Sequence, residues 1–383
     1  MYGLKDNNVQ LIINADLIED KAKAQVEAIA KHPALVGLVS IMPDVHFGKG
    51  CVIGFTGRFK DAVIPNIVGV DLGCGVTSYK LGTLDIDFSE LDKHIRKEVP
   101  LGFNRHKGSH HLNGLVLEET ALDVCSKMEQ IFESNKVQGT KAPHTQIGTL
   151  GGGNHFVEIE EYEGEKFLTV HSGSRHGGLK IANHFQSMAK KITEEMYVTV
   201  PDGLEYLPMN RGGNEYLKAV DVAQEYAAVN RRVMIEKIIS FFDMKYDESN
   251  VIESVHNYID QSGIIRKGAI SARQGEQVII PFNMAQGIAI GIGKSNSKYN
   301  FSAPHGAGRT SGRKAMQRKL ASGEVTMEQF RETMEGIFST SISPKTIDES
   351  PFVYKKFEDI EKHLRETVDI EMLAKPVYNL KSE

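Results

Sequence analysis

Residues 62–76 read AVIPNIVGVDLGCGV, a mostly apolar run that ends in Asp71 and Cys74 with a glycine on each side of the cysteine. The apolar part, 62–70, predicts a buried strand, because strands covered on both faces read as continuous apolar runs. Asp71 and Cys74 therefore follow a predicted strand end, where a sheet presents side chains to a common cavity. A capping aspartate beside a small buried cysteine would explain the same pattern without any chemistry.

The rest of the chain mixes predicted strands and helices without a regular βαβ alternation, which predicts an α+β fold. Amphipathic spacing predicts helices over 18–31, 87–98, 118–134, 178–196, 215–242, 310–321 and 356–367. Apolar runs predict further strands over 35–42, 51–55, 154–160, 167–171, 251–256, 276–281 and 285–292. No Pro/Ser-rich linker divides the 383 residues, so we expect one large domain, 1–383.

The composition argues against a membrane protein or a secreted disulfide scaffold. No apolar run approaches the ~20 residues of a membrane span, and the first residues lack the pattern of a signal peptide. Three cysteines, Cys51, Cys74 and Cys125, cannot all pair, so a reducing cytoplasm is expected. With a net charge of −5, the chain would need a local basic face to bind nucleic acid. The candidates for that face are Lys49, Arg175, Arg266, Lys267, Arg273, Arg309, Arg313, Lys314, Arg318 and Lys319.

Glycines cluster beside histidines in three places: GTLGGGNHF (148–156), HSGSRHGG (171–178) and PHGAGR (304–309). Glycine permits positive φ and lets the backbone approach a ligand closely. One such loop would be unremarkable. Three loops of this kind suggest a phosphate-bearing ligand near a metal.

Three histidines, His155, His171 and His256, adjoin predicted strands in the same manner as Asp71 and Cys74. A single buried histidine is more often a satisfied core residue than a ligand. Together, the thiolate, imidazoles and carboxylate suit a divalent ion such as manganese, iron, cobalt or zinc. The absence of a CxxC or HxxxH pair argues against structural zinc. Five ligands exceed the need of one tetrahedral ion, so Cys74 is expected to bridge two.

His305 precedes a predicted basic helix and follows Pro304. Histidine can act as a covalent nucleophile, and a glycine-rich turn at a helix start supplies N–H groups for phosphate. A nucleotidylated histidine is therefore chemically reasonable here. A helix-capping loop that contains a histidine without a catalytic role would explain the same sequence.

Taken together, these motifs resemble the RtcB family of RNA-splicing ligases. The matching stretches run through nearly the whole chain in order: MPDVHFGKG (42–50), GVDLGCGV (69–76), GTLGGGNHFVEI (148–159), HSGSR (171–175), HNY (256–258), RKGAISAR (266–273), VIIPFNM (278–284), HGAGR (305–309) and DESPFVYKKFEDIE (348–361). The resemblance implies a single-domain α+β fold, with mixed sheets around a deep metal-containing cleft. It implies joining of an RNA 2′,3′-cyclic phosphate or 3′-phosphate end to a 5′-hydroxyl end, with GTP and Mn²⁺.

The resemblance also implies a role for individual residues. Two Mn²⁺ ions would be bound by Asp71, Cys74, His155, His171 and His256. His305 would attack the α-phosphate of GTP and carry GMP, while Arg175 and Asp44 would lie near the RNA termini. The guanylate pocket would be formed by Asn154, Phe156, Glu158, His256, Asn257, Pro281, Phe282, Asn283, Met284, Ile288, His305, Gly306, Ala307, Gly308, Tyr354 and Lys381.

The chain departs from the family pattern in ways that leave alternatives open. Phe282 and Asn283 stand where relatives usually carry Gly followed by Ser or Thr, and Ile288 replaces a small hydroxyl residue. His176 adds a histidine that is expected beside the metals. Loss of GMP binding would favour a metal-dependent hydrolase that opens cyclic phosphates, and a silent RNA-binding paralogue is the third alternative. The choice between tRNA splicing and RNA repair, and the need for an activating protein partner, stay open.

Overall fold

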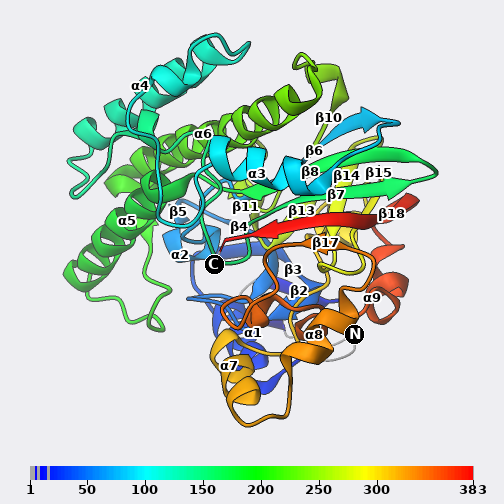
Figure 1. The fold of residues 1–383 in the computed structure, drawn as a ribbon. Coiled ribbons are helices and arrows are strands. Elements are labelled where there is room, and N and C mark those ends of the chain that lie inside the picture. The colour runs from blue at the N-terminus through cyan, green and yellow to red at the C-terminus, as the bar shows by residue number, and fades with distance from the viewer. Residues whose placement is uncertain (1–4, 7–8, 15–17, 383) are drawn as a thin grey trace.

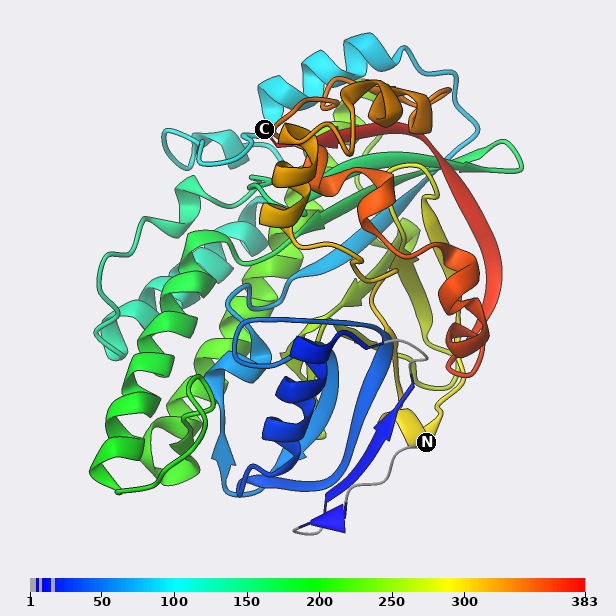
Figure 2. The same cartoon turned by 90° about the horizontal axis from the view of Figure 1, so that it is seen from below.

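Two β-sheets with helices packed against them make up the computed structural model, which describes residues 5–6, 9–14 and 18–382 (Figure 1). The smaller sheet has the order β1-β2-β3-β4-β12-β11. Its strands are β1 (Lys5–Asp6), β2 (Val9–Ile13), β3 (Leu35–His46), β4 (Ile53–Phe59), β12 (Ile265–Lys267) and β11 (Asn257–Ile259). Helix α1 (Asp20–Ala30) covers one face of this sheet (Figure 2). The observed mixture confirms the predicted α+β class.

The larger sheet has the order β10-β6-β8-β7-β18-β15-β14, and the short β17 (Phe338–Ser339) pairs with β18. Its strands are β10 (Val251–Val255), β6 (Gly75–Gly82), β8 (Glu165–Ser172), β7 (Phe156–Tyr162), β18 (Val368–Lys381), β15 (Ile288–Gly293) and β14 (Gln277–Pro281). The strand that comes last in the sequence thus lies between β7 and β15. Two further pairs join β13 (Ala269–Ser271) to β16 (Ser302–Pro304) and β5 (Ala62–Val63) to β9 (Leu207–Pro208).

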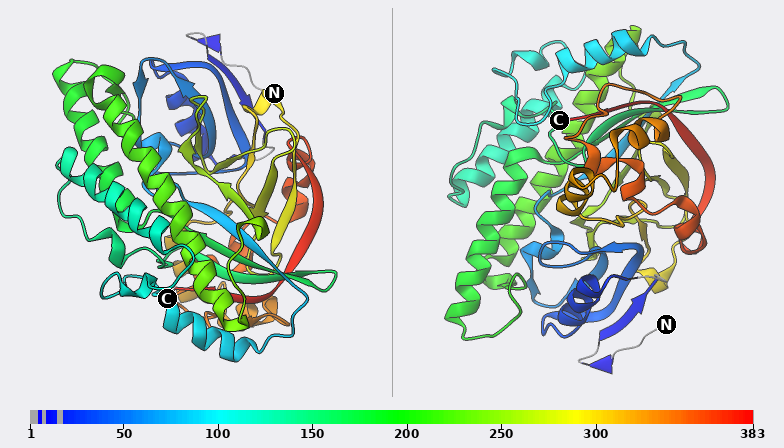
Figure 3. Two further views of the ribbon diagram at one scale, coloured as in Figure 1. Left: turned by 90° about the horizontal axis from the view of Figure 1, so that it is seen from above. Right: turned by 60° about the horizontal axis from the view of Figure 1, so that its bottom comes forward.

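The longest helix, α6 (Asn214–Ile239), packs against the larger sheet and against its neighbouring helices (Figure 3). Its neighbours are α3 (Phe88–Glu98), α4 (Glu118–Ser134) and α5 (Arg175–Glu195). The remaining helices are α2 (Pro65–Val68), α7 (Arg313–Ala321), α8 (Met327–Thr333) and α9 (Phe357–Leu364). No helix within the described ranges is both long and apolar enough to span a membrane.

Along β8, β7 and β18, alternate side chains face the apolar core on one side of the sheet and the site on the other. Leu168, Val157 and Leu380 belong to the apolar cluster that also contains the C-terminal turns of α6. Because successive strand residues point to opposite faces, His171, Glu158 and Lys381 point the other way. Pairing brings these opposite residues into adjacent rows: Phe156 with His171, Asn379 with Glu158, and Lys381 with Phe156. The strand register therefore builds one wall of a polar pocket.

The sequence prediction for the opening stretch is wrong, and that for the C-terminal region is incomplete. The predicted strand 62–70 is a two-residue β5 followed by α2, because Pro65 supplies the fixed φ of a first helical position. The strand that bears on the site is β6, which begins at Gly75, directly after Cys74. The predicted helix 356–367 ends at Leu364, and the 14-residue β18 that follows was not predicted.

Candidate metal centre and pocket

A pocket of about 810 Å³ opens at one edge of the larger sheet. Its walls come from the ends of β7, β8 and β18, from the loop 281–287, from the loop that follows β16 and from the first turns of α1 and α7. Fourteen of the residues predicted to bind the guanylate line it: Asn154, Phe156, Glu158, His256, Pro281, Phe282, Asn283, Met284, His305, Gly306, Ala307, Gly308, Tyr354 and Lys381.

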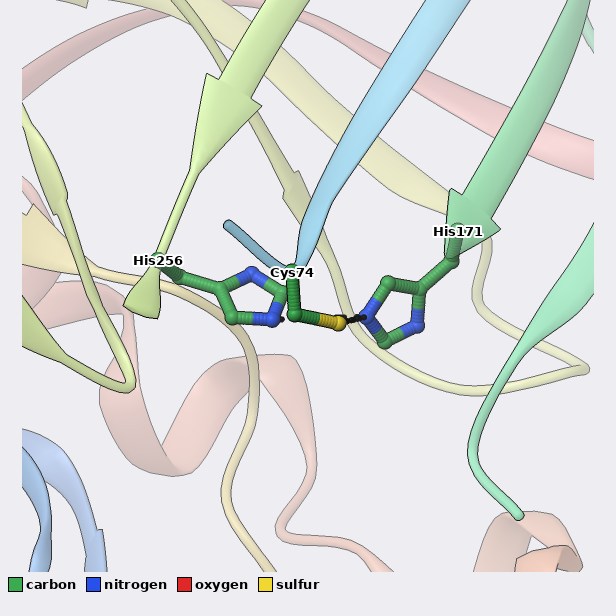
Figure 4. Close-up of side chains that lie close together, drawn as sticks. All are labelled: Cys74, His171 and His256. Carbon is green, nitrogen blue, oxygen red and sulfur yellow. Dashed lines mark hydrogen bonds between the residues drawn. The ribbon is translucent and has the colours of Figure 1, made fainter. Parts of the chain in front are cut away.

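The residues predicted to bind metal come together at this edge because the strands that carry them are antiparallel. Cys74 precedes β6, His171 ends β8, and His256 follows β10, so β10-β6-β8 pairing places all three at one edge. The Cys74 Sγ lies 3.3 Å from His171 Nε2, and the Nε2 atoms of His171 and His256 are 3.4 Å apart. Figure 4 shows the Cys74 side chain between the two rings.

A second group of donors shares the same sulfur atom. His155 Nε2 lies 3.5 Å from Cys74 Sγ and 2.9 Å from Asp71 Oδ2. The groups Cys74–His171–His256 and Asp71–Cys74–His155 each have donor atoms within 4.8 Å of one another. A sulfur shared by two sets of nitrogen and oxygen donors suits a pair of divalent transition-metal ions, so the residues present fit such a centre.

Backbone carbonyls fix the orientation of two of the imidazoles. The Nδ1–H of His155 donates to Leu150 O at 2.9 Å, and that of His171 donates to Asn154 O at 3.1 Å. Each ring therefore presents Nε2 to the donor cluster, which is how an outer hydrogen bond sets the tautomer of a metal ligand. Burial holds the pKa of His171 and of His256 well below the usual value, so both rings are neutral and able to ligate.

Arg175 lies on the Asp71 side of the cluster, at the start of α5. Its Nη1 is 3.2 Å from His155 Nδ1, and its Nε donates to Thr149 Oγ1 at 3.3 Å. A Cβ on Gly151 would lie 1.9 Å from the guanidinium, so only glycine leaves room for it there. The prediction that His176 stands beside the metals is wrong, since its Nε2 bonds to the carbonyl of Gly139, outside the ligand groups.

His305 lies beside the metal cluster without belonging to it. Its ring centroid is 4.8 Å from that of His256, which belongs to the Cys74–His171–His256 group. The Nδ1–H donates to Asp44 Oδ2 at 2.6 Å, and the same oxygen accepts the His305 backbone N–H at 3.1 Å. Asp44 is fully buried. Gly308 makes this approach possible, because it has φ +77° and a Cβ there would lie 2.4 Å from Asp44 O.

Phe282 and Asn283, which depart from the family pattern, are held by core packing and by turn hydrogen bonds. Phe282 is buried and meets Phe357 edge to face at 5.0 Å, while still lining the pocket. Asn283 accepts the N–H groups of Ala285 and Gln286 and so closes the turn.

Two predicted pocket residues lie outside its lining. Ile288 is fully buried in an apolar cluster, since β15 turns its side chain away from the pocket. Asn257 instead donates to Asp71 O at 3.3 Å and accepts from Gly268 N–H at 3.1 Å, which fixes the loop that carries Asp71 and Cys74.

Glu349 is a residue that sequence reasoning missed. It is 3% exposed, accepts a hydrogen bond from Arg309 at 3.0 Å and from the Tyr354 hydroxyl, and lies 3.5 Å from Lys381 Nζ. Burial alone would raise its pKa, but the charges of Lys381 and Arg309 hold the pKa below its usual value. The sequence offers one signal for this residue: Glu349 lies within the motif DESPFVYKKFEDIE (348–361), five residues before the predicted pocket residue Tyr354.

Glu158 and Glu160 form a buried acidic pair on β7. Glu158 accepts from Asn379 Nδ2 at 2.6 Å, and Glu160 accepts from Thr169 Oγ1 at 2.7 Å. Burial raises the pKa of both carboxyls, and the charge of Glu158 raises that of Glu160 further. The pair therefore favours a shared proton over two charges.

The predicted basic face divides into buried and accessible residues. Arg266 and Lys267 are buried, Arg266 being paired with Asp260. Arg313, Lys314 and Arg318 line the pocket.

Comparison with known proteins supplies an independent finding. The family model described as "tRNA-splicing ligase RtcB" matches residues 25–382. The "RNA-splicing ligase RtcB1" of Escherichia coli strain ATCC 25922 is 32% identical over 379 residues, which cover 90% of each chain. The "RNA-splicing ligase RtcB" of Escherichia coli K12 is 31% identical with the same coverage. The "tRNA-splicing ligase RtcB" of Thermococcus kodakarensis is 26% identical and covers 93% of this chain and 90% of its own.

Proposed function

The chain belongs to the RtcB family of RNA-splicing ligases, and from that premise we propose that it joins two RNA ends at the expense of GTP. One end carries a 2′,3′-cyclic phosphate or a 3′-phosphate, and the other carries a 5′-hydroxyl. A 3′-phosphate is a poor electrophile, so GMP must first be attached to it as a leaving group.

The observation that carries this proposal is the geometry of His305. Its Nδ1 is bound to Asp44 at 2.6 Å, which leaves Nε2 as the free nitrogen beside the pocket. Nε2 would attack the α-phosphate of GTP, forming a nitrogen–phosphorus bond while pyrophosphate leaves. GMP then passes to the RNA 3′-phosphate, which restores the histidine, and the 5′-hydroxyl displaces GMP. This contact supports Asp44 as a positioning residue for His305 in place of a role at the RNA termini.

The two ligand groups that share Cys74 support binding of two Mn²⁺ ions. Such ions would supply neutralisation of phosphate charge and an activated water for opening a cyclic phosphate. The Arg175 guanidinium, held on the same side as Asp71, would grip the terminal RNA phosphate with two hydrogen bonds.

The pocket walls support binding of the guanylate. Glu158 offers a carboxyl to the guanine N–H groups, and the ring of Phe156 offers an apolar face. The turn that contains Gly306 and Gly308 brings backbone close to the phosphates, and Lys381 lies 5.3 Å above the Phe156 ring.

Incubation with radiolabelled GTP and Mn²⁺ tests the proposal. We expect a labelled protein band that His305→Ala abolishes while bound metal is retained, since His305 belongs to neither ligand group. We also expect His305→Ala to seal RNA whose 3′ end already carries GMP. A variant that keeps its metals and its fold but cannot seal this RNA would contradict the division of roles.

The same experiment separates the alternative functions. Opening of a cyclic phosphate without a labelled band would identify the hydrolase, and neither signal would identify a silent RNA-binding protein. We further propose that residues 1–383 act as one ligase domain, because the site draws on segments from Asp44 to Lys381. The cytoplasmic location stays a prediction.

A further inference from the structure

An exposed phenylalanine, Phe47, lies between the pocket and a second cavity. The second cavity, of about 720 Å³, is lined by α1, the β3–β4 loop and residues 201–204. Phe47 and Lys21 line both cavities, so the two cavities adjoin at this point. Phe47 is 52% exposed, and among the exposed large apolar side chains of the described residues it alone lines either cavity.

The backbone that carries Phe47 is held rigidly. The Phe47 N–H donates to Glu19 Oε1 at 3.0 Å. The side-chain amide of Gln25 binds both backbone groups of Gly48, accepting its N–H at 3.2 Å and donating to its carbonyl at 2.6 Å. Further along the loop, the Lys267 ammonium donates to Lys49 O. The ring is thus presented to solvent by a fixed loop, and its exposure is not relieved by packing.

The charges around the ring favour a polyanion. Lys21 and Lys49 flank the second cavity, and neither forms an ion pair within the described part of the chain. Arg313, Lys314 and Arg318 line the first cavity, and Arg313 lies 3.6 Å from the carboxylates of Asp348 and Glu349. The nearby carboxylates are Glu19, which is engaged by the Phe47 N–H, and Asp202.

A flat ring on a fixed loop between cations is the arrangement by which proteins bind single-stranded nucleic acid. We propose that Phe47 is a stacking platform for one base of a single-stranded RNA substrate, close to the 3′ end that receives GMP from His305. Lys21 and Lys49 contact phosphates of the same strand. The second cavity is the path by which that strand leaves the site. This inference rests on the proposed function and adds to it the place where RNA is gripped outside the pocket.

Substitutions of Phe47 distinguish base stacking by its ring from a purely structural role of the side chain. Phe47→Ala should weaken binding of a 3′-phosphate RNA oligonucleotide about tenfold, as measured by direct titration without GTP. Phe47→Trp should bind as well as the parent, whereas Phe47→Leu should bind as poorly as Phe47→Ala, since leucine offers no π face. Tyr197→Ala is the matched control, because Tyr197 is 95% exposed and lines neither cavity.

Modified RNA locates the stacked base. Abasic nucleotides placed one at a time from the 3′ end should weaken binding to the parent protein at one position, and Phe47→Ala should remove that penalty. Lys21→Ala and Lys49→Ala should each flatten the log–log salt dependence of RNA binding by roughly 0.7.

Several results would overturn the proposal. RNA affinity of Phe47→Ala within twofold of the parent would do so, as would equal rescue by leucine and tryptophan. Loss of stimulation by a protein partner with unchanged RNA binding would identify Phe47 as a protein-docking residue instead. RNA binding is titrated directly, so absence of His305 labelling in the parent refutes the ligase function without deciding the role of Phe47.

Discussion

The metal cluster and the nucleotide wall of the pocket are built in different ways. The residues that could hold metal adjoin the ends of paired strands, and backbone carbonyls orient two of their rings. The wall is assembled from segments far apart in the sequence, around the buried carboxylate of Glu349. The sheet register fixes the first region, whereas a network of charges fixes the second. Substitutions should therefore remove metal in one region and weaken nucleotide binding in the other.

Cys74→Ala should have the largest effect, because this sulfur belongs to both ligand groups. We expect ligation to fall at least about 10³-fold and both metal ions to be lost, as measured by metal analysis of the purified protein. Cys51→Ala and Cys125→Ala are matched controls, since both thiols are buried but lie in an apolar cluster, and they should keep their metal. Full metal occupancy in Cys74→Ala would refute the bridging role.

Asp44→Asn should slow guanylylation by roughly 10²-fold while bound metal and the KM for GTP stay near the parent values. The amide oxygen is an uncharged and weaker acceptor of the His305 Nδ1–H than the carboxylate, so it holds the tautomer with a free Nε2 less firmly and stabilises less of the positive charge that the ring gains on attack. Single-turnover labelling with GTP measures the rate. A rate within threefold of the parent would show that the Asp44 contact does not position the nucleophile.

Arg175→Lys should lower ligation by about 10²-fold although the charge is kept, because an ammonium cannot reproduce the guanidinium fork. Arg318→Ala, at the pocket mouth, should change RNA affinity only a few-fold. Both variants are to be compared in ligation and in RNA binding across a salt series, with metal content as the control. Equal, small effects would mean that Arg175 does not hold the RNA terminus.

Glu349→Gln should raise the Kd for GTP about tenfold and leave the metals in place. Removing this charge releases Lys381 and Arg309 from their shared partner, so the pocket cations lose their fixed positions. Calorimetric titration of GTP measures the change, and Lys381→Ala should bring little further loss in the double variant. Additive losses of GTP affinity in the double variant would show that Glu349 and Lys381 act independently.

Glu160→Gln should have the smallest effect, visible in the pH dependence of stability. Burial raises the folded-state pKa of the Glu158–Glu160 pair, so its contribution is complete below the unfolded value of about 4.3 and is lost as the pH rises through the folded value. Between pH 5 and 8, the free energy of unfolding of the metal-free protein should fall about 1 kcal/mol less in Glu160→Gln than in the parent. Parallel urea-unfolding curves would contradict this.

More of the chemistry of the site than of the strand and helix arrangement could be predicted from the sequence. The α+β class and the family resemblance are confirmed, because long motifs such as GTLGGGNHFVEI are specific. The strand 62–70 was wrong because Pro65 begins a helix within an apolar run, which periodicity cannot detect. Glu349 and Asn379 were missed because their roles depend on partners brought close only by tertiary folding. The roles of His305 and Arg175 stay predictions.

The position of β18 has a consequence for synthesis. This strand lies between β7 and β15 in the sheet. It comes after both in the sequence, because β15 ends at Gly293 and β18 begins only at Val368, 75 residues later. A nascent chain that has not yet released residues 368–381 from the ribosome therefore holds β7 and β15 with unpaired edges. Such edges invite pairing with other chains, so the larger sheet depends on prompt insertion of its last strand after translation.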